Sequence, residues 1–288
     1  MAGEADGERD PVHGIRLPGP VTAAGREGLA ALVSEPAGAL IASDFDGTLS
    51  PIVPDPASAH AHPGAISALK RLAGAVGTVA IITGRPVSQA VELGALADLP
   101  GLIVLGHYGW ERWEEGRVTA PEPPPGVAEA RRGLPSLLRS AGAPEGTRTE
   151  DKGYALAVHT RGTTEPDRVL ARLRGPLEEL AGQAGLAVEP GRMVIELRPP
   201  GMDKGAALSG LAAERAATSV MFCGDDLGDL AAFAAVRALR AEGTPGLTVF
   251  SESPESAVPA DQADLVVDGP DGIAALLEAL AGQLAQLR

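Results

Sequence analysis

Short apolar runs alternate with helical stretches along most of the chain. The apolar runs read GALIAS, VGTVAIITG and LIVLG in the first part, and SVMFCGDD, LTVF and ADLVVD in the last part. The pattern predicts helices from about Pro63, from Pro86, from about Gly228 and through IAALLEALAGQL. This alternation is typical of right-handed βαβ units, so the sequence predicts an α/β fold with a parallel sheet covered on both faces.

The middle of the chain has a different pattern. After Gly109, WERWEEGRVTAPEPPPG reads as a short polar hairpin and a proline cluster, which can continue neither a helix nor a central strand. A helix over 127–139, a half-exposed antiparallel strand in TRTEDKGYALAVHTR, a helix from about Glu165 and strands in LAVEP and MVIELR follow. We interpret residues 114–199 as an α+β domain inserted into a core domain of residues 21–113 and 200–288. Residues 1–20 lack periodicity and read as a flexible tail.

Composition narrows the classes of function. The 288 residues are 44% hydrophobic, which excludes disorder of the whole chain. With 38 acidic and 24 basic residues the net charge is −14, so we do not expect nucleic acid as a partner. No apolar run reaches the roughly 18 residues of a membrane span, and the polar start does not resemble a signal peptide, so we expect a cytoplasmic protein without a membrane partner. The single cysteine excludes an internal disulfide.

The charge is unevenly distributed along the chain. Residues 114–199 hold 13 acidic and 12 basic side chains, whereas the rest of the chain holds 25 and 12. The acidity therefore belongs to the core domain. This division suits a core that holds a cation and an insert that faces an anionic small-molecule substrate.

Two carboxylates follow the first apolar strand. In ALIASDFDGT, Asp44 and Asp46 are two residues apart, so they share the side on which the strand ends. In open α/β folds this carboxyl edge is where ligands bind. Two carboxylates this close require a cation, or one of them stays protonated and serves as an acid. The alternative is an ordinary turn after a strand.

A second strand end and a helix start carry further polar groups. In TVAIITGRP, Thr83 and Arg85 lie in a turn whose hydroxyl and N–H groups suit an anion, although this turn taken alone favours Thr83 as a plain helix cap. Lys204 opens a helix, where its charge opposes the helix dipole. Since the chain has only three lysines, a counter-charge for a phosphoryl group is favoured over a solvated surface lysine.

Three acids cluster at another strand end, in SVMFCGDDLGDL. Asp225, Asp226 and Asp229 offer the hard oxygen ligands that suit Mg²⁺. Because Mg²⁺ takes only one or two carboxylates, not all three need be ligands, and one of them can cap the following helix.

The ordered set DFDGT, TGR, DKG and GDDLGD resembles the four motifs of the haloacid dehalogenase-like phosphotransferases, from residue 44 to residue 229. The resemblance implies a Rossmann-like core, a cap inserted between the second and third motifs, Mg²⁺ and an aspartyl-phosphate intermediate. It further implies that Asp44 is the nucleophile, that Asp46 is the acid and later the base, and that Thr83 and Lys204 hold the phosphoryl oxygens. The implied Mg²⁺ ligands are the Asp44 carboxylate, the Asp46 backbone carbonyl and Asp225, oriented by Asp226 and Asp229.

The insert carries acids and bases where a plain strand would not need them. Glu150 and Lys152 flank Asp151 on one strand face, and Glu196 interrupts the apolar run MVIELR. Such a face suits a polyhydroxylated sugar, whose hydroxyls both donate and accept hydrogen bonds. The alternative is a solvated face with cross-strand salt bridges.

The segments LGHYGWERW, EDKGYALAVHTR and ELRPPGMDKG, together with DFDGTLSPI, resemble those of trehalose-6-phosphate phosphatases over about residues 39–233. This resemblance implies trehalose 6-phosphate as the substrate. The chain departs from that family at Gly228 and Leu230, where Thr and Glu are usual, and at Tyr108, where His is common; these departures concern fine positioning. The residues implied as disaccharide ligands are Glu150, Lys152, Arg161 and Glu196, with Arg85 as a further substrate contact and His107 as a weaker candidate.

Other functions remain open at this point. A related cap-bearing phosphatase would act on another sugar phosphate, such as sucrose phosphate, and a non-catalytic sensor would bind a sugar phosphate without turnover. The sensor would not need a nucleophile and an acid together, and a glycosyltransferase with a DxD metal site would not need Lys204. The sequence does not determine the oligomeric state and is compatible with a monomer.

Overall fold

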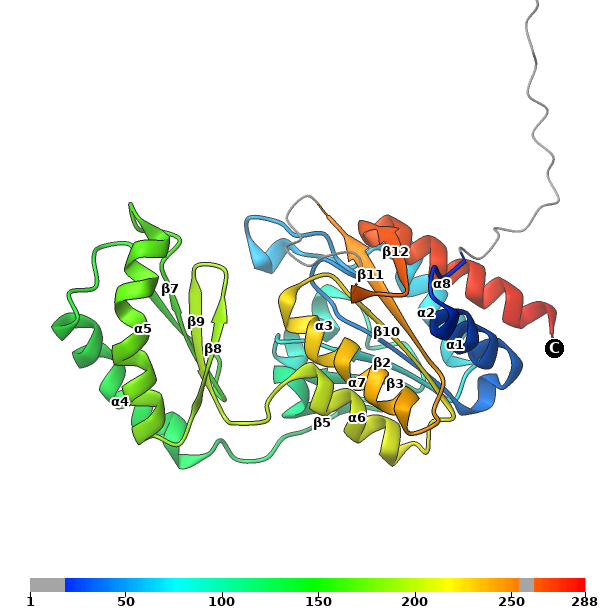
Figure 1. The fold of residues 1–288 in the computed structure, drawn as a ribbon, viewed down its shortest axis with the longest axis horizontal. Coiled ribbons are helices and arrows are strands. Elements are labelled where there is room, and N and C mark those ends of the chain that lie inside the picture. Colours follow the sequence, from blue (N-terminus) through cyan, green and yellow to red (C-terminus); the bar gives the residue numbers. More distant parts are fainter. Residues whose placement is uncertain (1–18, 254–261, 288) are drawn as a thin grey trace, which may run out of the picture.

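A computed structural model describes residues 19–253 and 262–287 of the chain. The flexible tail expected over residues 1–20 lies, except for its last two residues, outside the described residues. The described chain forms two bodies, each built on its own sheet, which lie side by side in Figure 1.

The larger body is built on eight strands. They are β1 (Ala39–Ser43), β2 (Thr78–Ile82), β3 (Leu102–Gly106), β4 (Glu111–Glu114), β5 (Arg117–Thr119), β10 (Ser219–Gly224), β11 (Gly246–Glu252) and β12 (Leu265–Asp268). Their order in the sheet is β12-β11-β10-β1-β2-β3-β4-β5, and the six strands from β12 to β3 are parallel. The predicted parallel sheet is confirmed.

Helices cover this sheet on both faces. One face is covered by α1 (Ala23–Ser34), α2 (Pro63–Ala73), α3 (Val87–Leu93) and α8 (Gly269–Gln286), and the other by α6 (Lys204–Glu214) and α7 (Leu230–Ala241). The central strand β1 is buried along its whole length, with Ile41 packed on the first face and Leu40 and Ala42 on the second. A strand with no solvent face reads as a continuous apolar run, which is why ALIAS has no alternation.

The polar hairpin predicted after Gly109 extends this same sheet. β4 pairs antiparallel with β3, and β5 with β4, so the hairpin forms one edge of the eight-stranded sheet. The chain therefore leaves the sheet after Thr119, later than the expected boundary near residue 113.

The smaller body is an antiparallel sheet with two helices. Its strands are β6 (Arg148–Asp151), β7 (Leu156–His159), β8 (Ala187–Gly191) and β9 (Val194–Arg198), in the order β6-β7-β9-β8, and its helices are α4 (Pro125–Ser140) and α5 (Pro166–Gln183). The helices pack on one sheet face, through residues such as Leu173 and Ile195. We call residues 125–198 the cap and the rest of the described chain the core. These elements confirm the predicted α/β core with an inserted α+β unit.

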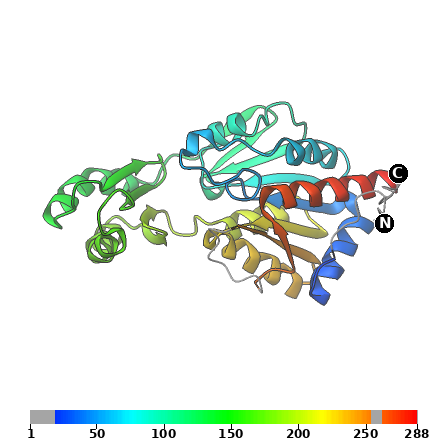
Figure 2. The ribbon, with the colours of Figure 1, turned by 90° about the horizontal axis from the view of Figure 1, so that it is seen from above.

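The cap turns its other sheet face toward the core. In Figure 1 the two cap helices lie on the far side of the cap sheet, and Figure 2 shows the two chain connections that join the bodies. Period-two alternation puts Glu150, Ala157 and Glu196 on this open face, paired in one row across the strands. None of the helices in the described part of the chain is long and apolar enough to cross a membrane.

Candidate active site

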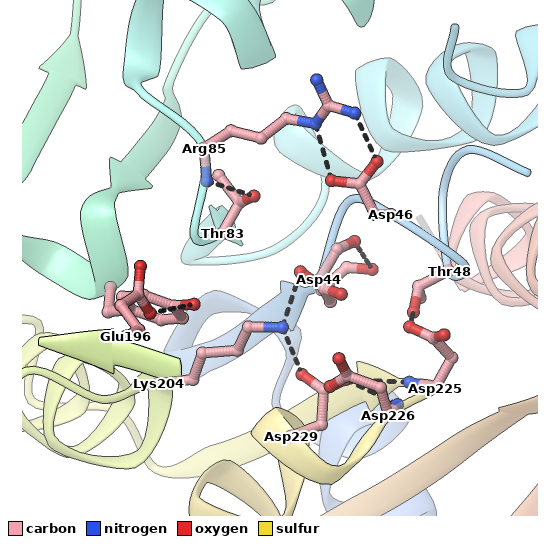
Figure 3. Close-up of polar contacts among 12 residues, drawn as sticks. Asp44, Asp46, Thr48, Thr83, Arg85, Glu196, Lys204, Asp225, Asp226 and Asp229 are labelled. Carbon is pink, nitrogen blue, oxygen red and sulfur yellow. Dashed lines mark hydrogen bonds and ion pairs between the residues drawn. The ribbon is translucent and has the colours of Figure 1, made fainter. Parts of the chain in front are cut away.

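The turn after β1 brings two acids from different strands together. The Asp44 N–H donates to the Cys223 carbonyl of β10 at 2.8 Å, which extends the parallel ladder past the strand end. Gly47 has φ +78°, and a Cβ there would lie 2.0 Å from an Asp225 carboxylate oxygen. Only glycine therefore fits this turn. Thr48 Oγ1 donates to Asp225 Oδ1 at 3.3 Å and fixes the second acid from the same turn (Figure 3).

Lys204 lies between two buried carboxylates. Its Nζ is 2.8 Å from Asp44 Oδ1 and 2.7 Å from Asp229 Oδ1, and the lysine side chain is 5% exposed (Figure 3). Burial disfavours the ammonium form, but Asp229 and Asp44 outweigh it and raise the pKa of Lys204 well above its usual range. Lys204 is the first residue of α6. The N-terminus of this helix is still capped, because the Asp203 side chain accepts the Ala206 N–H.

The acids around Lys204 are buried, which disfavours their ionised forms. Burial raises the pKa of Asp44 well above its usual range, with Lys204 opposing the shift. Burial, then Asp229 and Asp226, raise the pKa of Asp225 to about 8. Burial raises the pKa of Asp229 to about 6, again against the effect of Lys204. One lysine does not compensate three buried carboxylates, so the site has a surplus of negative charge.

This surplus fits a divalent cation. Asp44, Asp225 and Asp229 each offer an oxygen within 4.8 Å of the others, and all three residues are buried. An all-oxygen carboxylate set suits a hard cation such as Mg²⁺. Of the sequence-predicted ligands, Asp44 and Asp225 are in this cluster.

Asp229 and Asp226 organise the turn after β10. The Asp229 carboxylate accepts the backbone N–H groups of Asp225 and Asp226 at 2.9 and 3.1 Å, while Asp226 caps the short 3₁₀ turn over Leu227–Asp229. Asp226 is exposed on the cavity side, whereas Asp229 is fully buried. The helix predicted from about Gly228 starts with this turn and continues as α7 from Leu230.

Asp46 is paired with Arg85. The guanidinium donates from Nε and Nη2 to the two carboxylate oxygens at 2.6 and 2.7 Å (Figure 3). Nη2 also donates to the Pro56 carbonyl at 2.9 Å. This two-point contact holds the Asp46 carboxylate away from the Lys204 cluster. Beside it, Thr83 Oγ1 accepts the Arg85 N–H at 3.1 Å, so the hydroxyl shapes the turn that follows β2.

A cavity of about 480 Å³ lies over these groups and is lined from both bodies. The core contributes Asp44, Asp46, Thr83 and Lys204, and the cap contributes Glu150, Asp151 and Lys152. Acids and bases of the cap therefore line the same cavity as the acids at the strand ends of the core.

The open face of the cap sheet is a network of paired charges. Lys152 Nζ is 2.9 Å from Glu196 Oε1, and His159 Nε2 is 3.0 Å from Glu150 Oε2. The contact with His159 lowers the pKa of Glu150. Burial opposes the ammonium form of Lys152, but Glu196 raises the pKa of this lysine on balance.

The other two predicted residues are not members of this network, although His107 borders it from the core. Arg161 is exposed in the loop after β7 and, within the described structure, does not line the cavity. His107 is 2% exposed and faces Glu111 at 3.7 Å, and burial lowers its pKa.

Two side chains that sequence reasoning did not select are part of the site. The Tyr108 hydroxyl donates to Glu196 Oε2 at 3.3 Å, and the Arg198 guanidinium lies 4.6 Å from the centre of the Tyr108 ring. Arg198 had a signal in the sequence, because it is two residues from Glu196 and shares its strand face. Tyr108 was visible as a departure from the resembled family.

Two comparisons of the amino-acid sequence with known proteins identify the same family. Residues 42–268 match the trehalose-phosphatase family. A curated relative, the trehalose-phosphate phosphatase of Mycobacterium marinum, is 34% identical over 290 residues, covering 96% of this chain and 68% of that protein.

Solved structures share the fold. A crystal structure described as a trehalose-6-phosphate phosphatase related protein is 25% identical with a TM-score of 0.66, covering 86% of this chain and all of that one. The C-terminal domain of the Candida albicans trehalose-6-phosphate phosphatase has a TM-score of 0.72 over 92% of this chain and 99% of that chain. At 19% identity the second likeness concerns the fold alone.

Proposed function

Because the chain belongs to the trehalose-phosphatase family and is a phosphoric monoester hydrolase of the haloacid dehalogenase-like fold, we propose that it hydrolyses trehalose 6-phosphate to trehalose and phosphate. The observation that carries this proposal is the shared cavity. Buried acids paired with Lys204 lie on its core side, and a sugar-suited face of mixed charges lies on its cap side.

In the first step Asp44 is the nucleophile. One of its oxygens forms a bond to phosphorus while the ester bond from phosphorus to the sugar oxygen breaks, and Asp46 gives its proton to the leaving alkoxide. The contact with Lys204 at 2.8 Å supports this role, because it holds the Asp44 carboxylate in one orientation. Thr83 and Lys204, which line the cavity beside Asp44, would hold the phosphoryl oxygens.

In the second step a water molecule displaces Asp44 from phosphorus. Asp46 takes a proton from a water molecule, the water oxygen bonds to phosphorus, and the bond between phosphorus and Asp44 breaks to release phosphate. Both steps require Asp46 to leave its two-point pairing with Arg85. We expect the anionic phosphoryl group to compete for Arg85, which would free Asp46 when substrate is bound.

The buried acids fit Mg²⁺ as the cofactor. The carboxylates of Asp44 and Asp225 and the backbone carbonyl of Asp46 would hold it, with Asp229 beside them and Asp226 at the edge. When bound, it would offset the repulsion between an anionic nucleophile and an anionic ester. On the cap, Glu150, Lys152 and Glu196 would bind the disaccharide hydroxyls, with Arg161 reaching them only if its exposed loop moves.

The test is phosphate release over a panel of sugar phosphates, with Mg²⁺ and with EDTA. We expect the highest kcat/KM on trehalose 6-phosphate, no release in EDTA, and recovery when Mg²⁺ is added back. A higher kcat/KM on sucrose phosphate or glucose 6-phosphate would overturn the substrate. Undiminished release in EDTA would overturn the metal dependence.

A further inference from the structure

The turn after β3 has an uncommon backbone. His107, Tyr108 and Gly109 have φ values of +46°, +56° and +98°, so two residues with a Cβ occupy the left-handed region in succession. L-residues are disfavoured there, and such a conformation persists only where the surroundings fix it. The contacts of this turn are therefore informative about its role.

On one side the turn is attached to the phosphate end of the site. The His107 N–H donates to the Arg85 carbonyl and the Tyr108 N–H to the Thr83 carbonyl, both at 2.9 Å. These are the residues of the turn after β2, whose hydroxyl and guanidinium border Asp44 and Asp46. The backbone at Tyr108 is thus held in a fixed relation to the proposed phosphoryl site.

On the other side the same turn reaches the cap. The Tyr108 ring lies under the Arg198 guanidinium, and its hydroxyl lies 3.3 Å from Glu196. The rings of His107 and Trp110 contact Tyr154 of the cap, with centroids 5.4 and 5.8 Å apart. The core meets the open face of the cap sheet at this turn.

Glu196 is a confined carboxylate. Its side chain is 8% exposed, with Lys152 at 2.9 Å and Arg198 at 3.7 Å, both from the cap. Among the described residues, the Tyr108 phenol is the neutral partner of Glu196 and comes from the core. Burial, together with Glu196, raises the pKa of Tyr108 to about 12, so the phenol keeps its proton and donates to the carboxylate at ordinary pH.

We propose that Tyr108 is the positioning residue for sugar selection: it fixes Glu196 and Arg198 of the cap relative to the phosphoryl site of the core. The inference rests on the proposed function and adds a residue to it. A carboxylate has about four lone-pair sites, so Glu196 retains acceptors for sugar hydroxyls beside its present partners. These acceptors reach the sugar only when Glu196 is held at the right position relative to the phosphoryl site. The Tyr108 hydroxyl and ring determine that position through their contacts with Glu196 and Arg198.

The experiment compares Tyr108→Phe, Tyr108→Ala and wild type. Phenylalanine removes only the hydroxyl and keeps the ring, whereas alanine also removes the ring beneath Arg198. All three residues have a Cβ, which is disfavoured in the left-handed region. For each protein we would measure the ratio of kcat/KM on the preferred sugar phosphate to kcat/KM on p-nitrophenyl phosphate, which has no sugar to present to the cap. Loss of a hydrogen bond to a confined charge predicts that this ratio falls about 5- to 30-fold in Tyr108→Phe and further in Tyr108→Ala.

The other tyrosine supplies the matched control. Tyr154 also lies where cap and core meet, but its hydroxyl donates to the Pro121 carbonyl at 2.7 Å, and within the described structure it does not line the cavity. Tyr154→Phe should keep the ratio within about twofold of wild type. We expect the loss in Tyr108→Phe as a raised KM on the sugar phosphate, with thermal unfolding near that of wild type.

Each outcome decides the matter. A ratio in Tyr108→Phe equal to that of wild type, or equal to that of Tyr154→Phe, overturns the role of Tyr108. If wild type prefers a sugar phosphate other than trehalose 6-phosphate, the proposed substrate is wrong, and the ratio on the preferred one still tests Tyr108. If wild type shows no preference for any sugar phosphate, both proposals are wrong.

Discussion

At the residue scale, the proposed chemistry depends most on one carboxylate oxygen of Asp44. Replacing Asp44 by Asn keeps the size of the side chain but removes the nucleophile, so we expect phosphate release to fall by about a thousandfold or more. Phosphate release and thermal unfolding would be measured together, and the fold should be retained. Asp203→Asn is the control, since Asn caps a helix as well as Asp does and the change lies next to Lys204. A rate near that of wild type in Asp44→Asn would exclude the mechanism.

The same acids make the stability depend on pH and on metal. Asp225 and Asp229 have folded-state pKa values of about 8 and about 6, both above the ordinary value of 3.8. Between about pH 4 and about pH 8 the folded protein therefore binds more protons than the unfolded chain. Their contribution to stability is full below about pH 4 and is lost as the pH rises to 8. In EDTA the Tm should fall over this window.

Magnesium should reverse this loss, because a cation favours the ionised carboxylates that high pH produces. We expect the rise in Tm on adding Mg²⁺ to be larger at pH 8 than at pH 5.5. Differential scanning calorimetry in EDTA and in Mg²⁺ at both pH values measures it. An equal rise at the two values would contradict a site formed by these acids.

How far the sequence predicts this site depends on the kind of information needed. Asp44, Thr83 and Asp225 directly follow apolar strands, and neighbouring parallel strands end at one edge, so their approach is predictable. The pairing of Arg85 with Asp46 is not predictable, because a long side chain has several acids within reach. The contacts of Tyr108 were not predictable either: the sequence shows this residue only as a departure from the resembled family, and the left-handed backbone it adopts is one that its residue type disfavours.

At the scale of elements, α1 is packed against one face of the sheet through a glycine. A Cβ on Gly28 would lie 1.9 Å from the Gly246 carbonyl oxygen of β11. Gly28→Ala must push α1 off the sheet, so we expect a loss of stability of about 2 kcal/mol or more. Gly210→Ala is the matched control, because this helical glycine in α6 has open space around its Cβ position and should gain up to about 1 kcal/mol. Urea unfolding measures both, and equal effects would contradict the close packing of α1.

Elements also differ in how much of their surroundings the sequence contains. The hydrophobic pattern within an apolar run or an amphipathic stretch indicates which of its residues are buried. The strands of the parallel sheet and the helices between them were therefore predictable. The hairpin over residues 111–119 was predictable as a hairpin but not as part of the eight-stranded sheet. Its pairing with β3 is a choice of partner, which a local pattern of polar residues does not contain.

At the scale of the whole molecule, the cavity is lined by two bodies that are joined by two connections (Figure 2). Binding a transition-state mimic should draw them together, because the cap charges and the core acids then share one ligand. Small-angle scattering should give a smaller radius of gyration with Mg²⁺ and a fluorometallate than with Mg²⁺ alone. Fluoride without the metallate is the control. Superimposable curves in all three conditions would count against closure.

The strand order has a consequence for how the protein is made. β1 pairs with β10, whose residues follow about 180 positions later, and the whole cap lies between them. On the ribosome the cap can complete its own apolar cluster while β1 still lacks one neighbour, because its contacts are local in the chain. Until the last third of the chain emerges, the nascent protein holds Asp44 without Lys204 and Asp225, and it exposes an open sheet edge. The interval in which this chain most needs protection from aggregation is therefore set by the length of its insert.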